Sequence, residues 1–192
     1  MRVAFVVNYV LAVLLGLLSI IVGKSEFLIY AGVLLFVAVL LHVSDRFASF
    51  HPVALWGFSV WAVLHIVGGL GKIGQTRVYD FVLIRLVGEP YSILRYDQFV
   101  HFYCYVVIAL LLGSVVQRVV AKDAHWFTVA FILVLASTGI GALNEIVEFL
   151  PVVLFNSPGP GGYVNTALDL IANFLGSIVG SAVFLTWLRR RA

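Results

Sequence analysis

The sequence predicts an all-α fold, a polytopic membrane helix bundle of about six transmembrane helices with one short interfacial or re-entrant helix. The chain is 62% hydrophobic and 11% charged, with a mean hydropathy of +1.10, whereas soluble proteins average about 25% charged residues. Its 192 residues also provide room for roughly six apolar stretches of about 20 residues, the length that crosses a bilayer. One integral membrane domain over residues 1–192 is therefore expected.

The first three spans are expected at residues 3–22, 27–43 and 52–70. The first span is longer than the apolar core of a signal peptide and lacks the small-residue cleavage pattern that follows one, so it is expected to stay in the mature protein. The second span ends where a polar run begins at His42, and the third begins at Pro52, a residue that suits the first turn of a helix.

A long connection, residues 71–96, follows the third span and surrounds the apolar stretch Phe81 to Val87. Because this stretch is too short to cross a membrane, we predict an interfacial or re-entrant helix that caps the bundle. A Pro- and Gly-rich turn is expected from Pro151 to Gly162. The remaining spans are expected at 96–116, 126–150 and 164–188.

The orientation depends on a small difference in basic residues between the two sides. With a cytoplasmic N-terminus, seven Lys and Arg residues lie inside and five outside, and three of the seven form the C-terminal run Arg189 to Arg191. The positive-inside rule therefore predicts that both termini are cytoplasmic and that the connections 71–96 and 151–162 are external.

Cysteine content and charge exclude several classes of protein. Cys104 is the only cysteine, so one chain forms neither an internal disulfide nor a cysteine metal cage. The net charge is +3, and the terminal arginines suit anionic lipid headgroups better than nucleic acid. We therefore expect membrane lipids as partners and no nucleic acid, and the sequence leaves the oligomeric state open.

Polar residues that a bilayer normally excludes lie at four helix ends that must meet on one side of the membrane. Antiparallel alternation places the end of the third span, the start of the fourth, the end of the fifth and the start of the sixth together. Each carboxylate costs roughly 2.5–3.5 kcal/mol at a helix centre, so several together imply mutual partners, water or a bound cation. In the predicted orientation they lie near the outer face. The residues are His65, Asp97, His101, Glu145, Glu148, Asp169 and Asn173.

The spacing within each helix places these residues on single faces. Asp97 and His101 are four positions apart, and Glu145 and Glu148 are three apart, while Asn165, Asp169 and Asn173 form a stripe at intervals of four. Three such faces are able to converge on one pocket. Small residues continue the stripes deeper into the membrane and allow close helix approach, namely Gly139 and Gly141 in the fifth span and Gly176 and Gly180 in the sixth.

Imidazoles grouped with carboxylates and amides are typical of sites that hold divalent zinc, manganese, magnesium or iron. A helix-borne E-x-x-E pattern also occurs where carboxylates bridge metals in helix bundles. We therefore predict a divalent metal ion with His101, Glu145 and Asp169 as its ligands.

Further residues would complete such a site. The candidate catalytic residues are Glu148, as a bridging ligand or general base, and Asp97, which would orient His101. The candidate substrate-binding residues are His65, Asn165 and Asn173 together with Arg85 and Arg95, whose guanidinium groups suit an anionic headgroup.

A simpler interpretation assigns these residues no ligand. Charges at helix ends are often solvated by the membrane interface, and Glu148 lies closest to the end of its span. His65, which is followed by Gly68 and Gly69, has an alternative role as a packing histidine.

Four sequence blocks resemble the YjdF-like family of bacterial inner-membrane proteins over roughly Pro52 to the C-terminus. They are H-I-V-G-G at His65 to Gly69, R-Y-D-Q-F-V-H-F at Arg95 to Phe102, N-E-I-V-E-F at Asn144 to Phe149 and D-L-I-A-N-F-L-G at Asp169 to Gly176. The resemblance implies a multi-pass protein of the inner (plasma) membrane. Asn144 and Leu168 stand where this family usually has aromatic residues, and the acidic positions are intact.

The last three blocks are also similar, more distantly, to the VanZ-like family. In that family an Asp-x-x-x-His helix start, an acidic helix end and an Asp-x-x-x-Asn-x-x-Gly helix start occur in this order. VanZ-like proteins are associated with glycopeptide (teicoplanin) resistance and the cell envelope, so the resemblance implies an envelope role.

Missing motifs narrow the choice of reaction. The sequence lacks the D-G-x-x-A-R pattern of CDP-alcohol phosphotransferases, the P-S-G-H block of lipid phosphatases and the G-x-S-x-G nucleophile elbow. An enzyme with this sequence is expected to promote metal-assisted attack by water or a hydroxyl on a phosphate or ester of a lipid or lipid-linked substrate. The alternatives are a non-catalytic lipid- or antibiotic-binding envelope protein and a cation- or proton-coupled transporter.

Overall fold

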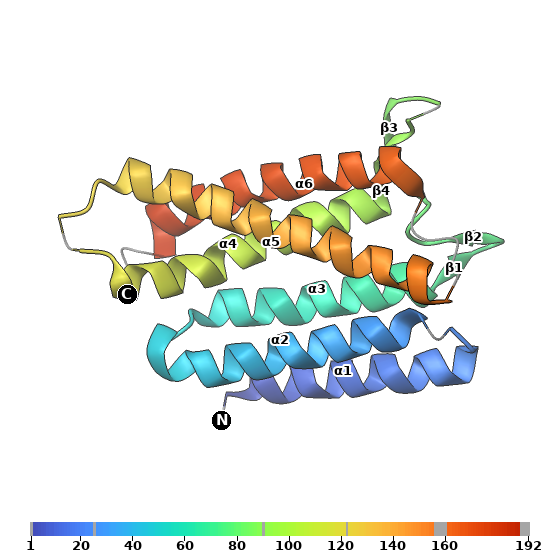
Figure 1. Cartoon of the computed structure of the whole chain (residues 1–192), viewed down its shortest axis with the longest axis horizontal. Coiled ribbons are helices and arrows are strands. Elements are labelled where there is room, and N and C mark those ends of the chain that lie inside the picture. The colour runs from blue at the N-terminus through green and yellow to red at the C-terminus, as the bar shows by residue number, and fades with distance from the viewer. Residues whose placement is uncertain (1, 25, 90, 122, 156–160, 189–192) are drawn as a thin grey trace.

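The computed structural model contains six long helices that lie roughly antiparallel in a bundle (Figure 1). All six helices are long and apolar enough to cross a membrane, which confirms the predicted all-α polytopic fold. The structure describes residues 2–24, 26–89, 91–121, 123–155 and 161–188. The helices are α1 (Val3–Val22), α2 (Glu26–Ala48), α3 (Pro52–Leu70), α4 (Tyr96–Val119), α5 (Trp126–Phe155) and α6 (Gly162–Val183), and α6 continues into the π-helix η1 (Phe184–Leu188).

The predicted bounds of α1 and α3 are confirmed, and the start of α3 shows why. Pro52 occupies the first helical turn, where its missing N–H costs no hydrogen bond. The side chain of His51 accepts a hydrogen bond from the Val53 N–H at 3.2 Å and so caps the helix.

The predicted end of α2 at residue 43 was too early, because the helix continues to Ala48. Polar side chains in the last turns of α2 find hydrogen-bond and ion-pair partners while the backbone stays helical. Asp45 accepts a hydrogen bond from the Phe50 N–H at 3.0 Å and forms an ion pair with Arg2 at 3.0 Å. Polarity at this point therefore does not mark the end of the helix.

The predicted end of α5 at residue 150 was also too early, since α5 includes Pro151 and ends at Phe155. Proline is tolerated in membrane helices where its neighbours satisfy the freed backbone group, and Pro151 is buried against the bundle. The predicted turn from Pro151 to Gly162 is therefore helical at its start. Its residues 156–160 lie outside the described part of the chain.

The predicted interfacial or re-entrant helix over Phe81 to Val87 was wrong. These residues form strand β3 (Val82–Val87), which pairs antiparallel with β4 (Ile93–Arg95) in a hairpin beyond the helix ends (Figure 1). A short helix without a packing partner is unstable, whereas a Val- and Ile-rich segment pairs readily. A second small hairpin joins β1 (Lys72–Ile73) to β2 (Thr76–Arg77).

The bundle has two halves, and the second is the more tightly packed. Helix α1 packs against both α2 and α3, α3 packs against α4, and α4, α5 and α6 pack against one another (Figure 1). Helices α4 and α6 approach closely because Gly176 and Gly180 expose their backbone to α4. A methyl group added at Gly176 would collide with the carbonyl oxygen of Phe102, and one at Gly180 with that of Val106.

The Gly176→Ala substitution is expected to destabilise the protein by about 1–3 kcal/mol, because the collision is with a backbone atom that moves only if the helices separate. Thermal unfolding of the detergent-solubilised protein measures the change. Gly139→Ala is the matched control, since its methyl group would meet no atom within 4 Å, and it should melt at or slightly above the wild-type temperature. Equal melting temperatures for the two variants would contradict the close α4–α6 contact.

Candidate functional site

Side chains from α4, α5 and α6 surround the imidazole of His101 within the membrane-spanning part of the bundle. We call this set the His101 cluster. It contains Asp97, His101, Glu145, Glu148, Asn165, Asp169 and Asn173, joined by hydrogen bonds and ion-pair contacts. The sequence prediction that three polar helix faces converge is thus realised in the structure.

Asp97 and Asp169 lie on the α4–α6 side of the cluster. The Nδ2 of Asn165 donates to Oδ2 of Asp97 at 3.2 Å and also to Oδ2 of Asp169. The Oδ1 of Asp97 lies 3.7 Å from Nε2 of His101. The side chain of Asp169 is fully buried, and its Oδ1 has no hydrogen-bond partner among the described residues. An ionised oxygen in this position strongly favours a bound cation or proton.

Glu145 and Glu148 approach His101 from α5. The Oε1 of Glu145 lies 3.5 Å from Nδ1 of His101, and the Oε1 of Glu148 lies 3.4 Å from Nε2. Two asparagines hold these carboxylates. Asn144 Nδ2 donates to Glu148 at 2.7 Å, and Asn173 Nδ2 donates to Glu145 at 3.5 Å.

The amide of Asn173 fixes the tautomer of His101. Its Oδ1 lies 3.0 Å from His101 Nδ1 and is able only to accept, so Nδ1 carries the proton. In the neutral ring Nε2 then has a free lone pair, directed between Asp97 and Glu148. An imidazole with one nitrogen held by a neighbour and the other free is the usual arrangement of a histidine that binds metal.

Two overlapping sets of three potential ligands result. One comprises Asp97, His101 and Asp169, and the other His101, Glu145 and Glu148. The potential ligand atoms within each set lie within 4.8 Å of one another. Among the described residues, no lysine or arginine forms an ion pair with any of the four carboxylates. The excess of acidic over basic groups makes the cluster suited to bind a cation or to hold protons.

A small cavity lies between His101 and His65 of α3. It is also lined by Trp61, Cys104 and Glu148, and its volume is about 10 Å³, roughly the space that one water molecule requires. His65 therefore borders the cluster without contacting its centre.

Aromatic residues enclose His65 on the remaining sides. The hydroxyl of Tyr79 lies 2.6 Å from His65 Nδ1 and 3.2 Å from the His65 carbonyl oxygen, to which it donates. The ring of Trp61 lies 5.4 Å from that of His65. Burial raises the pKa of the Tyr79 phenol well above its usual value, which keeps the group neutral. Tyr79 rather than the segment Phe81 to Val87 thus covers this side of the site.

The chain matches the family of predicted membrane proteins DUF2238 over residues 3–190. It is a member of that family. The YjdF-like family indicated by the sequence blocks is this same family, and the match extends over α1 and α2 as well as the region that carried the blocks. No curated protein and no solved structure matches the chain.

Two of the residues predicted to bind substrate stand apart from the others in this DUF2238 member. Arg85 is exposed on β3, and no hydrogen bond or ion pair in the described part of the chain joins it to the His101 cluster. Arg95 precedes α4, where its backbone N–H donates to Oε1 of Gln98 at 3.1 Å. The Nε of Arg95 is buried without a described partner. The structure thus unites the acids, His101 and the asparagines and leaves the arginines outside.

Several polar contacts of this DUF2238 protein were missed by sequence reasoning. The Oγ of Ser177 donates to Ser137 at 2.9 Å, and Ser181 lies buried one turn further along α6. The stripe that begins at Asn165 therefore continues through the helix as hydroxyl groups, and its four-residue spacing was visible in the sequence. The contact of Tyr79 with His65 had no comparable signal, because a loop residue has no periodicity.

Proposed function

We propose that the His101 cluster binds a divalent metal ion and that the protein is a metal-dependent hydrolase or transferase for a lipid or lipid-linked substrate of the cell envelope. One observation carries the proposal. A single imidazole lies among four buried or half-buried carboxylates, and no lysine or arginine of the described residues pairs with them. A buried set of this charge requires protons or a cation, and its oxygen and nitrogen atoms suit zinc, manganese, magnesium or iron.

The contacts support distinct roles within the cluster. His101 and Asp169 belong to one set of potential ligands and would hold the metal, with the unpartnered Oδ1 of Asp169 as a ligand atom, whereas Glu145, the third predicted ligand, lies in the second set, which shares His101. Glu148 lines the water-sized cavity and would act as the general base for an attacking water or hydroxyl. Asn173 accepts the Nδ1 proton and would position the His101 ring, while Asp97 lies beside the free Nε2 and would offer a further carboxylate oxygen to the metal. The bound metal would polarise the phosphate or ester under attack.

The resemblance to VanZ-like proteins supports an envelope substrate, since the order of the three acidic blocks is shared. The same resemblance also suits a non-catalytic protein that binds a lipid or antibiotic in this pocket. A hydrolase or transferase forms a product, whereas a non-catalytic protein only binds its ligand. The experiment must therefore measure a product as well as binding.

Transport is a further candidate, and one observation favours it. Asn165, Asp169, Asn173, Ser177 and Ser181 form a buried polar line along α6. The close contact of Gly176 and Gly180 with the backbone of α4 leaves little space beside this line. The packing therefore favours a fixed site over a conducting path.

Metal content and lipid composition test the proposal together. We expect the purified wild-type protein to retain a stoichiometric divalent metal by mass spectrometry and His101→Gln to lose it. Cells lacking the protein should show an altered envelope lipid profile that wild type restores and Glu148→Gln does not. Metal-free wild-type protein would refute the metal site, and full restoration by Glu148→Gln would refute the general base. Retained metal with an unchanged lipid profile would support non-catalytic binding instead.

We further propose that the protein lies in the inner membrane with both termini in the cytoplasm and the His101 cluster near the outer face. The support is the larger number of basic residues on the side that carries the termini. In a Cys104→Ser background, a cysteine at exposed Thr76 should react with an impermeant maleimide in intact spheroplasts. A cysteine at exposed Ala121 should react only after permeabilisation. The reverse pattern would invert the orientation.

A further inference from the structure

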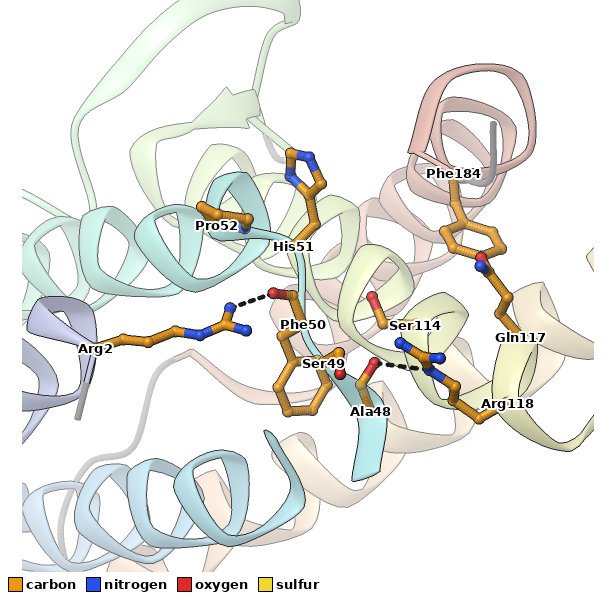
Figure 2. A pocket seen from close by; sticks show the side chains of 10 residues that line it. All are labelled: Arg2, Ala48, Ser49, Phe50, His51, Pro52, Ser114, Gln117, Arg118 and Phe184. Atoms are coloured by element: carbon orange, nitrogen blue, oxygen red, sulfur yellow. Dashed lines mark hydrogen bonds between the residues drawn. The ribbon is translucent and has the colours of Figure 1, made fainter. Parts of the chain in front are cut away.

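A second site lies at the end of the bundle opposite the His101 cluster. A cavity of about 350 Å³ opens between the α2–α3 connection, the last turns of α4 and the residue Phe184 of η1 (Figure 2). Its size falls within the range of cavities that bind small ligands. Its polar lining consists of Arg2, Ser49, His51, Ser114, Gln117 and Arg118.

The two arginines of this cavity are in different electrostatic situations. Arg2 is largely satisfied, because it pairs with Asp45 at 3.0 Å and donates to the carbonyl oxygen of Phe50. Arg118 is exposed, and among the described residues its side chain donates one long hydrogen bond, 3.5 Å from Nε to the carbonyl oxygen of Ala48. Within the described residues no carboxylate lies within ion-pair distance of Arg118. No described acidic residue therefore offsets the charge of Arg118.

Two buried aromatic residues, Phe184 and Phe50, belong to the lining of the cavity. Phe184 is 1% exposed, and its ring packs against Gly113, where an added methyl group would collide with it. Phe50 is also buried beside the cavity (Figure 2). Apolar lining residues beside a guanidinium that has no described acidic partner match a ligand that carries both a phosphate and an apolar part.

We propose that this cavity binds the phosphate group of an anionic phospholipid from the leaflet at this end of the bundle. The guanidinium of Arg118 contacts the phosphate, and the amide of Gln117 and the guanidinium of Arg2 lie on the same lining. The apolar lining, in which Pro52 is exposed, contacts the glycerol and the first carbons of the chains. A free phosphate anion shares the recognition chemistry of the headgroup but gains nothing from these apolar contacts.

Lipid titration of the delipidated full-length protein by native mass spectrometry tests the proposal. Phosphatidylglycerol should bind more tightly than phosphatidylcholine with the same acyl chains. Arg118→Gln should weaken phosphatidylglycerol binding by about tenfold, the loss expected for one charge-assisted contact. Arg46→Gln is the matched control, because Arg46 is exposed near the same end and does not line the cavity. Equal binding of the two lipids, or equal affinities of the two variants, would overturn the proposal.

Two further measurements keep the result interpretable. If Arg118→Gln fails to fold, Arg118→Lys should retain most of the affinity, and wild-type binding should weaken between about 0.05 and about 0.5 M NaCl. Binding that is independent of salt would count against the charged contact. Inorganic phosphate should raise the melting temperature less than phosphatidylglycerol does. Equal stabilisation by inorganic phosphate would exclude the lipid as the source of the phosphate group.

Discussion

Asp169→Asn is expected to abolish the thermal stabilisation that a divalent metal gives the wild-type protein. Asp169 is fully buried, and its Oδ1 has no described hydrogen-bond partner, so the carboxylate gains most from a cation. A metal at about 100 times its dissociation constant stabilises the folded state by about 2.7 kcal/mol. The melting temperature of the solubilised protein, measured with metal and with chelator, should therefore differ for wild type and be the same for Asp169→Asn.

Glu145→Gln should give the same loss of metal response, since Glu145 belongs to the second set of potential ligands around His101. Asp123→Asn is the matched control, because Asp123 is an exposed acid in the connection between α4 and α5. This variant should respond to metal as wild type does. If wild type and every variant melted at one temperature with and without chelator, the metal site would be excluded and the cluster would be held by protons.

His101→Gln is expected to destabilise the metal-free protein by about 3–5 kcal/mol, the cost of removing one partner from a buried ionic group. The imidazole contacts three of the four carboxylates and is the only basic side chain of the described residues that does so. Its loss leaves Asp97, Glu145 and Glu148 without their shared partner. Chemical unfolding in the presence of chelator measures this change apart from any metal effect.

A double-mutant cycle identifies the origin of this cost. Glu148→Gln removes one carboxylate beside His101 Nε2, so the double variant should be more stable than the sum of the single effects predicts, by at least about 0.5 kcal/mol. Pairing His101→Gln with Asp45→Asn is the control, because Asp45 pairs with Arg2 at the other end of the bundle. Those two effects should add. Additivity in both cycles would show that His101 acts through packing alone.

Sequence reasoning succeeded where a pattern repeats along a helix. The convergence of Asp97, Glu145 and Asp169 follows from helical spacing and antiparallel alternation, both of which are set by local geometry. The start of α3 was predicted because Pro52 has a strong positional preference. Spacing alone predicted which residues meet, but not that Asn144 and Asn173 hold the carboxylates in place.

Sequence reasoning failed where the conformation of a segment depends on which other segment it contacts. The stretch Phe81 to Val87 is apolar enough for an interfacial helix. It forms a strand because it pairs with Ile93–Arg95, which its own sequence does not reveal. Pro151 was taken as a helix end because proline disfavours helices in water. In α5 it lies within the helix, since packing against neighbours outweighs that preference. Tertiary contacts of this kind have no local signature.

The division of the bundle into an apolar half and a half that holds the ionisable cluster has a consequence for biogenesis. Helix α6 carries Asn165, Asp169 and Asn173, and one aspartate at a helix centre costs about 2.5–3.5 kcal/mol when a helix leaves the translocon alone. Its polar partners are on α4 and α5, which are synthesised before it. Stable insertion of α6 into the lipid therefore depends on α4 and α5 remaining close to the translocon until α6 emerges. The residues that form the candidate site are thus also residues on which membrane insertion of the last helix depends.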